Sequence, residues 1–170
     1  MNLPPLNSID AIIVGVLMLG VMVGGLRGTT RELFSLGAVL GGHYLAKSGY
    51  QAMAPGLSAA IEIPQVAGAT AYILLFIVCL LGIELLAGMI VRTMNLGKAY
   101  HFADHLGGLV LGGIKGVILV GIIIATLMVW PQGRTGISKS FVSATFIPTA
   151  KTFSAGLKIL PAKKDLLEKR

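Results

Sequence analysis

The chain has 170 residues, of which 55% are apolar and only 12% are charged, whereas soluble domains carry about 25% charged residues. A soluble core cannot bury this much apolar surface, so the composition excludes an ordinary soluble domain. The net charge of +7 comes mostly from residues 132–170, which hold eight basic and two acidic side chains. A basic tail on a membrane domain favours contact with anionic lipid headgroups over nucleic acid.

Four apolar stretches are long enough to cross a hydrocarbon layer of about 30 Å, which takes about 20 helical residues. They lie at about 10–26, 33–53, 67–91 and 106–130. The first is followed by Arg27 where a signal peptide would need a small-residue cleavage site, so we expect it to be retained. The sequence therefore predicts an all-α membrane protein whose residues 1–131 form a four-helix transmembrane domain, with the helices in two consecutive hairpins.

Residues 132–170 are predicted to form a basic amphipathic tail. Phe153, Leu157 and Leu160 fall on one side of a helical wheel, and two lysines fall on the opposite side. This pattern predicts a C-terminal helix that begins after Pro148 and lies in the membrane surface, with a disordered end. The alternative is a basic tail that is disordered throughout.

Basic residues in the short loops predict the orientation of the helices. Arg27 and Arg31 follow the first stretch, Arg92 and Lys98 follow the third, and Lys47 alone accompanies the second. Loops rich in lysine and arginine remain in the cytoplasm, which predicts that both termini are periplasmic. The basic tail favours the opposite orientation, but several of its charges lie too far from a helix for this rule to apply strongly.

Glycine recurs at every fourth position in two of the stretches. The two series are Gly20, Gly24 and Gly28, and Gly108, Gly112 and Gly116. A spacing of four places each series on one helix face, where the missing side chains allow two backbones to approach closely. Packing within one four-helix unit and packing against another subunit both remain open.

Glu84 and Lys115 lie inside apolar stretches, where each charge costs at least about 2.5 kcal/mol. Counted along a hairpin of the third and fourth helices, both lie at a similar depth, so we expect them to form an ion pair. This pair could set the register of the hairpin or, with His43, contribute to a polar path for ions or protons. A lone histidine at that position also commonly hydrogen-bonds a neighbouring helix.

The sequence contains no nucleophile elbow, no HExxH and no P-loop. Its single cysteine, Cys79, excludes an internal disulfide and a CxxC site. The segment "YHFADH" holds His101, Asp104 and His105, which could bind a metal only on a helix face, and we expect a short loop there. We therefore expect no enzymatic activity, no cofactor and no metal.

Two segments resemble a known family. "RGTTRE" directly after the first stretch, and "ADHLGGLVLGGIKGVILVG" at the start of the fourth, are similar to motifs of the colicin V production protein (CvpA) family of bacterial inner-membrane proteins. The family commonly has arginine where this sequence has His105 and Lys115. The residues that carry the resemblance are Arg27, Gly28, Arg31, Glu32, Asp104, Gly108, Gly112, Lys115 and Gly116.

The resemblance implies a four-helix, non-enzymatic protein of the bacterial inner membrane that is needed for colicin V production or export and is linked to envelope homeostasis. It also implies similarity to membrane-embedded parts of mechanosensitive channels, so a subunit of a small channel or transporter is the alternative. The expected partners are anionic lipids at the basic loops and tail, and further copies of the chain or other envelope proteins.

The charged residues of "RGTTRE" have a structural interpretation that needs no ligand. Arg27 and Arg31 can lie at the cytoplasmic headgroups, and Glu32 can accept from the free amides in the first turn of the second helix. The functional alternative is that the arginines, with Arg92 and Lys98 nearby, bind an anionic lipid or a cytoplasmic partner.

Overall fold

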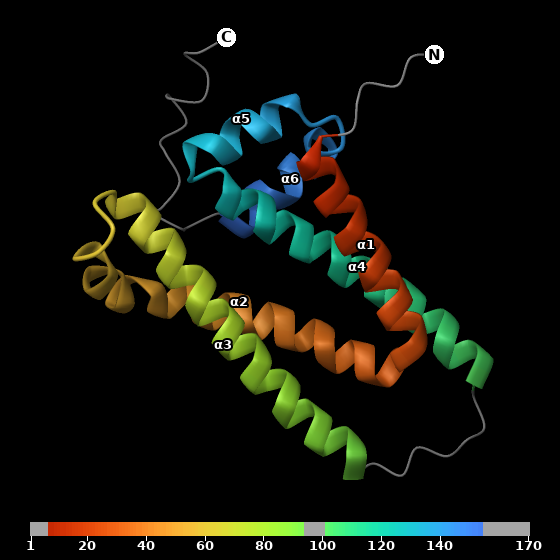
Figure 1. Cartoon of the computed structure of the whole chain (residues 1–170). Helices are drawn as coiled ribbons and strands as arrows, with labels where there is room; N and C mark the ends of the chain where they lie inside the picture. The colour runs from red at the N-terminus through yellow and green to blue at the C-terminus, as the bar shows by residue number, and fades with distance from the viewer. Residues whose placement is uncertain (1–6, 94–100, 155–170) are drawn as a thin grey trace, which may run out of the picture.

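The computed structural model describes residues 7–93 and 101–154, with the backbone alone at 101, 102, 131 and 132. Within these ranges the chain is helical and contains no strand, so the all-α prediction is confirmed (Figure 1). The helices are α1 (Ser8–Arg27), α2 (Thr29–Ser58), α3 (Pro64–Thr93), α4 (His101–Leu127), α5 (Pro131–Lys139) and α6 (Ser143–Ser154).

Three of the described helices are long and apolar enough to cross a membrane. They are α1, α3 and the Ala103–Leu127 part of α4. The helix α2 is 30 residues long, but Glu32, His43 and Lys47 interrupt its apolar sequence. The predicted fourth crossing over 33–53 is therefore not confirmed.

The long helices pack in two pairs that differ from the predicted consecutive hairpins. α1 lies along α4, and α2 lies along α3, while α2 also contacts α4 (Figure 1). By contrast, α1 and α2 share few contacts although they adjoin in sequence. The predicted pairing of the first helix with the second and of the third with the fourth is not confirmed, because α1 packs on the distant α4 and α2 packs on α3.

The two glycine series face each other between α1 and α4, which run antiparallel. A Cβ atom added to Gly20 would lie 2.7 Å from the carbonyl oxygen of Gly112, and one added to Gly24 would lie 2.8 Å from the Cα of Gly112. Gly108 meets the backbone of Gly24 in the same way, and Gly116 continues the contact. The glycines thus pack within one chain, where close backbone approach maximises van der Waals attraction.

The helices α5 and α6 fold back onto α4 and onto the beginning of α1. The buried carboxylate of Asp10 accepts hydrogen bonds from the Ser140 hydroxyl and, at 3.0 Å, from the backbone N–H of Val142. The side chain of Asn7 donates to the carbonyl of Gly136 at 2.9 Å. These bonds fasten the turn between α5 and α6 to the start of α1.

The predicted surface helix of the tail is not confirmed. Ser140 Oγ accepts the backbone N–H of Ser143 at 3.0 Å, so α6 begins there and Pro148 lies inside it. The helix packs along α4, and Ala150 on its buried side is only 1% exposed. Leu157 and Leu160 lie outside the described residues.

Candidate functional site

The turn between α1 and α2 consists of one residue, Gly28. Its φ of 81° is the only positive φ among the described residues, and glycine adopts that conformation without steric cost. The Asp104 carboxylate lies against it, so that a Cβ at Gly28 would be 2.9 Å from Asp104 Cγ. A side chain at this position would therefore be both strained and in collision with α4.

Asp104 caps the start of α2 from another helix. Its Oδ1 accepts the backbone N–H of Thr29 at 2.9 Å, and its carbonyl accepts the Thr29 hydroxyl at 2.7 Å. A helix leaves its first amides unpaired, and a carboxylate is a strong acceptor for them. The next residue, His105, donates from Nδ1 to the carbonyl of Gly25. The start of α4 thus holds the end of α1 and the start of α2 together.

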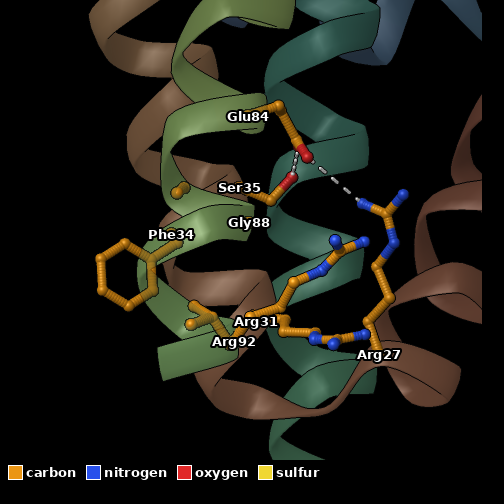
Figure 2. Close-up of a pocket in the computed structure, with 9 residues that line it drawn as sticks. Arg27, Arg31, Phe34, Ser35, Glu84, Gly88 and Arg92 are labelled. Carbon is orange, nitrogen blue, oxygen red and sulfur yellow. Dashed lines mark hydrogen bonds and ion pairs between the residues drawn. The ribbon is translucent and has the colours of Figure 1, made fainter. Parts of the chain in front are cut away.

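Glu84 on α3 contacts the end of α1 and the first part of α2. Its Oε1 accepts the Ser35 hydroxyl, and its Oε2 lies 3.6 Å from Nη1 of Arg27 (Figure 2). Ser35 is on α2 and Arg27 is the last residue of α1. Glu84 therefore ties α3 to both helices of the turn.

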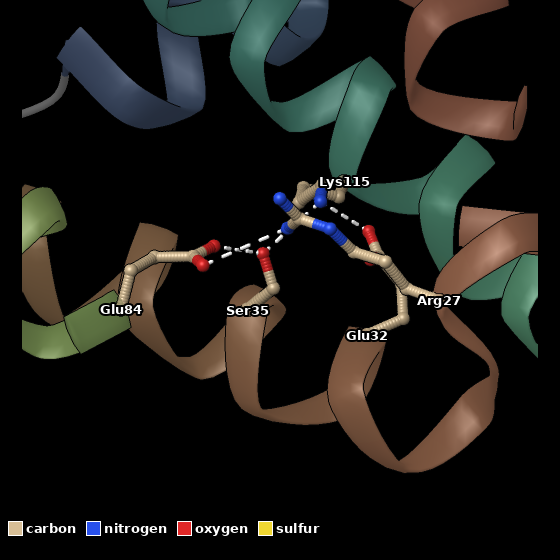
Figure 3. Close-up of polar contacts among 5 residues, drawn as sticks. All are labelled: Arg27, Glu32, Ser35, Glu84 and Lys115. Atoms are coloured by element: carbon tan, nitrogen blue, oxygen red, sulfur yellow. Dashed lines mark hydrogen bonds and ion pairs between the residues drawn. The ribbon is translucent and has the colours of Figure 1, made fainter. Parts of the chain in front are cut away.

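Lys115 on α4 completes the cluster. Its ammonium forms an ion pair with Glu32 and donates to Ser35 Oγ at 3.0 Å (Figure 3). The Glu32 side chain is fully buried, and apart from Lys115 no described group donates a hydrogen bond to its carboxylate. The ion pair with Lys115 is therefore what compensates its charge. We call Arg27, Glu32, Ser35, Glu84 and Lys115 the charged cluster.

The charged cluster corrects the predicted direct pair of Glu84 and Lys115. Both residues do lie at one depth, because both contact the hydroxyl of Ser35. Each carries its own ion pair, however: Lys115 with Glu32, and Glu84 with Arg27. The prediction assumed that α3 and α4 pack as a hairpin, whereas α2 lies against both of them.

The contact of Lys115 with Ser35 has the residue types of a serine–lysine catalytic pair, in which a neutral lysine removes the hydroxyl proton. Here Lys115 is ion-paired with Glu32. The Ser35 hydroxyl donates a hydrogen bond to Glu84. Lys115 and Ser35 are thus each bonded to a carboxylate.

Beside the charged cluster lies an open pocket with a volume of about 190 Å³. Arg31 and Arg92 line one end of it, and Glu84 and Ser35 lie at the other, where the Arg27 guanidinium reaches Glu84 (Figure 2). Arg31 and Arg92 are both exposed, and neither forms a hydrogen bond or an ion pair within residues 7–93 and 101–154.

The other candidate residues lie apart from this cluster. His43 Nδ1 is 2.7 Å from the hydroxyl of Tyr72, and its ring packs on that of Phe153, which confirms the expected hydrogen bond to a neighbouring helix. No group of three metal-binding side chains occurs in the described residues. Asp104 and His105 are engaged with α1 and α2, and the side chain of His101 lies outside the described part.

Sequence reasoning missed two partners. It treated Glu32 as an acceptor for helix amides and assigned no role to Ser35. A signal was present, because Glu32 and Ser35 are three residues apart and therefore lie on one face of the helix, where two polar side chains can share a buried contact. Asp10 carried a similar signal at the start of α1, but its partner Ser140 could not be found from spacing alone.

Three described helices are long and apolar enough to cross a membrane, which is typical of a polytopic helical membrane protein. The sequence matches the family model described as Colicin V production protein over residues 9–152. The chain therefore belongs to the colicin V production protein family, as the two motifs predicted. No curated protein and no solved structure showed significant similarity to it.

Proposed function

We propose that this protein is a non-enzymatic component of the bacterial inner membrane that supports the production or export of colicin V and the homeostasis of the envelope. The observation that carries the proposal is the family match, which covers nearly all of the described helices. The charged cluster supports it further, because residues from both family motifs, Glu32 and Lys115, meet in one buried ion pair.

The proposed orientation places both termini in the periplasm. It requires α2 to cross the membrane together with α1, α3 and α4. The burial of Glu32 and Ser35 against other helices supports this crossing, because polar groups inside a bilayer must face protein partners. The basic residues Arg27, Arg31 and Arg92 then lie at the cytoplasmic face, in agreement with the positive-inside rule.

The test is complementation of a strain from which the gene has been deleted. We expect the wild-type chain to restore secretion of colicin V and growth in bile-type detergent. Lys115→Met should restore neither, because Glu32 loses its counter-charge. Glu62→Gln is the matched control, since Glu62 is an exposed carboxylate between α2 and α3, and it should complement fully.

Full complementation by a chain that carries Lys115→Met would contradict a role for the charged cluster. Failure of the wild-type chain in both assays would overturn the proposed function itself. The alternative of a small channel has a direct readout, because purified protein in liposomes would then release a trapped ion upon osmotic stretch. We expect no such release, because Val39, Tyr72 and Phe76 fill the space between α2 and α3.

A further inference from the structure

The pocket beside the charged cluster carries uncompensated positive charge. Its three guanidinium groups belong to Arg27, Arg31 and Arg92, and its one carboxylate is that of Glu84. Arginine stays protonated at any physiological pH, so the lining has an excess of two positive charges. Among the described residues, Glu84 contacts only Arg27 of these three, at 3.6 Å.

These three arginines lie at the ends of helices, where basic side chains reach the headgroup region of a membrane. Arg27 is the last residue of α1, Arg31 lies in the first turn of α2, and Arg92 lies in the last turn of α3. Large apolar side chains on the same end of α3 point outward, with Leu85 71% exposed and Met89 66% exposed. The pocket is thus cationic, and apolar surface suited to acyl chains adjoins it.

We propose that this pocket binds the phosphate of an anionic phospholipid headgroup. Guanidinium groups recognise phosphate through two parallel hydrogen bonds each, and no described residue occupies the donors of Arg31 or Arg92. The volume of about 190 Å³ is below the range of about 300–1,000 Å³ that is typical of pockets for whole small molecules. A headgroup fits such a space, while the acyl chains remain outside along α3.

The inference does not depend on the proposed role in colicin V production, because it is tested on purified protein. The full chain is prepared in mixed micelles that contain either phosphatidylglycerol or zwitterionic phosphatidylcholine. Native mass spectrometry then measures the bound lipid as its concentration is varied. We expect phosphatidylglycerol to bind about tenfold more tightly than phosphatidylcholine, which corresponds to about 1.4 kcal/mol.

The variant Arg31→Gln/Arg92→Gln should lose this preference. The matched control is Lys139→Gln/Lys151→Gln, which removes two exposed cations from α5 and α6 and should keep the preference. Thermal unfolding without added lipid shows whether each variant folds, and we expect both to unfold near the wild-type temperature because all four side chains are exposed. A third arm adds inorganic phosphate as a competitor.

Three results would overturn the assignment. Equal binding of the two lipids by the wild-type chain would show that the pocket does not select an anionic headgroup. An equal loss of preference in the control variant would show that overall surface charge is responsible. Displacement of phosphatidylglycerol by inorganic phosphate at a similar concentration would identify a soluble phosphate, and not a lipid, as the ligand of the arginines.

Discussion

Lys115 and Glu32 form an ion pair between α4 and α2 in which the two side chains are only 9% and 0% exposed. Each charge lowers the free-energy cost of burying the other, because an isolated buried charge costs several kcal/mol. The pair joins the two motifs of the family, one at the start of α2 and the other in α4. The ion pair also holds α4 against α2, which packs on α3.

Removal of one partner should therefore destabilise the protein more than removal of both. Lys115→Met leaves the Glu32 carboxylate buried without a counter-charge, at a cost of about 3–5 kcal/mol. The double variant Glu32→Gln/Lys115→Met should recover part of this loss. Thermal unfolding in detergent measures Lys115→Met, Glu32→Gln and the double variant, and strictly additive effects would show that the two residues do not interact.

Replacement of Gly28 should strain the turn between α1 and α2. Gly28→Ala forces a side chain into a positive φ, which costs about 1–2 kcal/mol, and brings its Cβ against the Asp104 carboxylate. Gly37→Ala is the control, because nothing lies within 4 Å of a Cβ at that position and alanine favours the helix. We expect the first variant to unfold at a lower temperature than the wild type and the second at an equal or higher one.

The glycine contact between α1 and α4 should be needed for packing but not for insertion into the membrane. Gly112→Leu places a side chain where the backbone of α1 lies, and it should abolish complementation. Insertion should persist, since leucine partitions into the membrane more readily than glycine. Protease protection measures insertion, and Gly82→Leu, which has open space around it, should retain both properties. Full activity of the Gly112 variant would refute the importance of the contact.

Loss of Asp10 should release α5 and α6 from the start of α1. Asp10→Ala removes the acceptor for Ser140 and for the backbone of Val142, and hydrogen bonds to a charged group contribute about 1.5–3 kcal/mol each. We expect faster hydrogen exchange over residues 133–154 than in the wild type. Ser138→Ala should leave exchange unchanged, because the hydroxyl of Ser138 bonds only within its own helix. Equal protection in the Asp10 variant would contradict this role.

The proposed orientation predicts opposite accessibility for the two ends of α3. In a Cys79→Ala background, Glu62→Cys should react with an impermeant maleimide once the outer membrane is permeabilised. Thr93→Cys should react only after the inner membrane is broken, since a helix of 30 residues is about 45 Å long. Both positions are exposed in the structure. The reverse pattern of labelling would place the termini in the cytoplasm.

Some elements could be predicted because their signals are local. The four long helices follow from apolar runs, and the observed bounds differ from the predicted ones by only a few residues for α1 and α3. The glycine series indicated a close contact, because a spacing of four on a helix determines a face. Neither signal identifies the helix that lies opposite, so the consecutive hairpins were an assumption about connectivity and did not follow from the residues.

The sequence by itself determined that the protein is helical and apolar, that charges are concentrated near the turn at Gly28, and that the chain resembles its family. Only the tertiary structure decided that α1 pairs with α4, that Lys115 pairs with Glu32 and not with Glu84, and that Asp10 holds the turn before α6. The physical reason is that helix formation and apolar periodicity are properties of neighbouring residues. The partner of a buried charge depends instead on how whole helices pack, and several carboxylates along this chain could have satisfied Lys115 equally well.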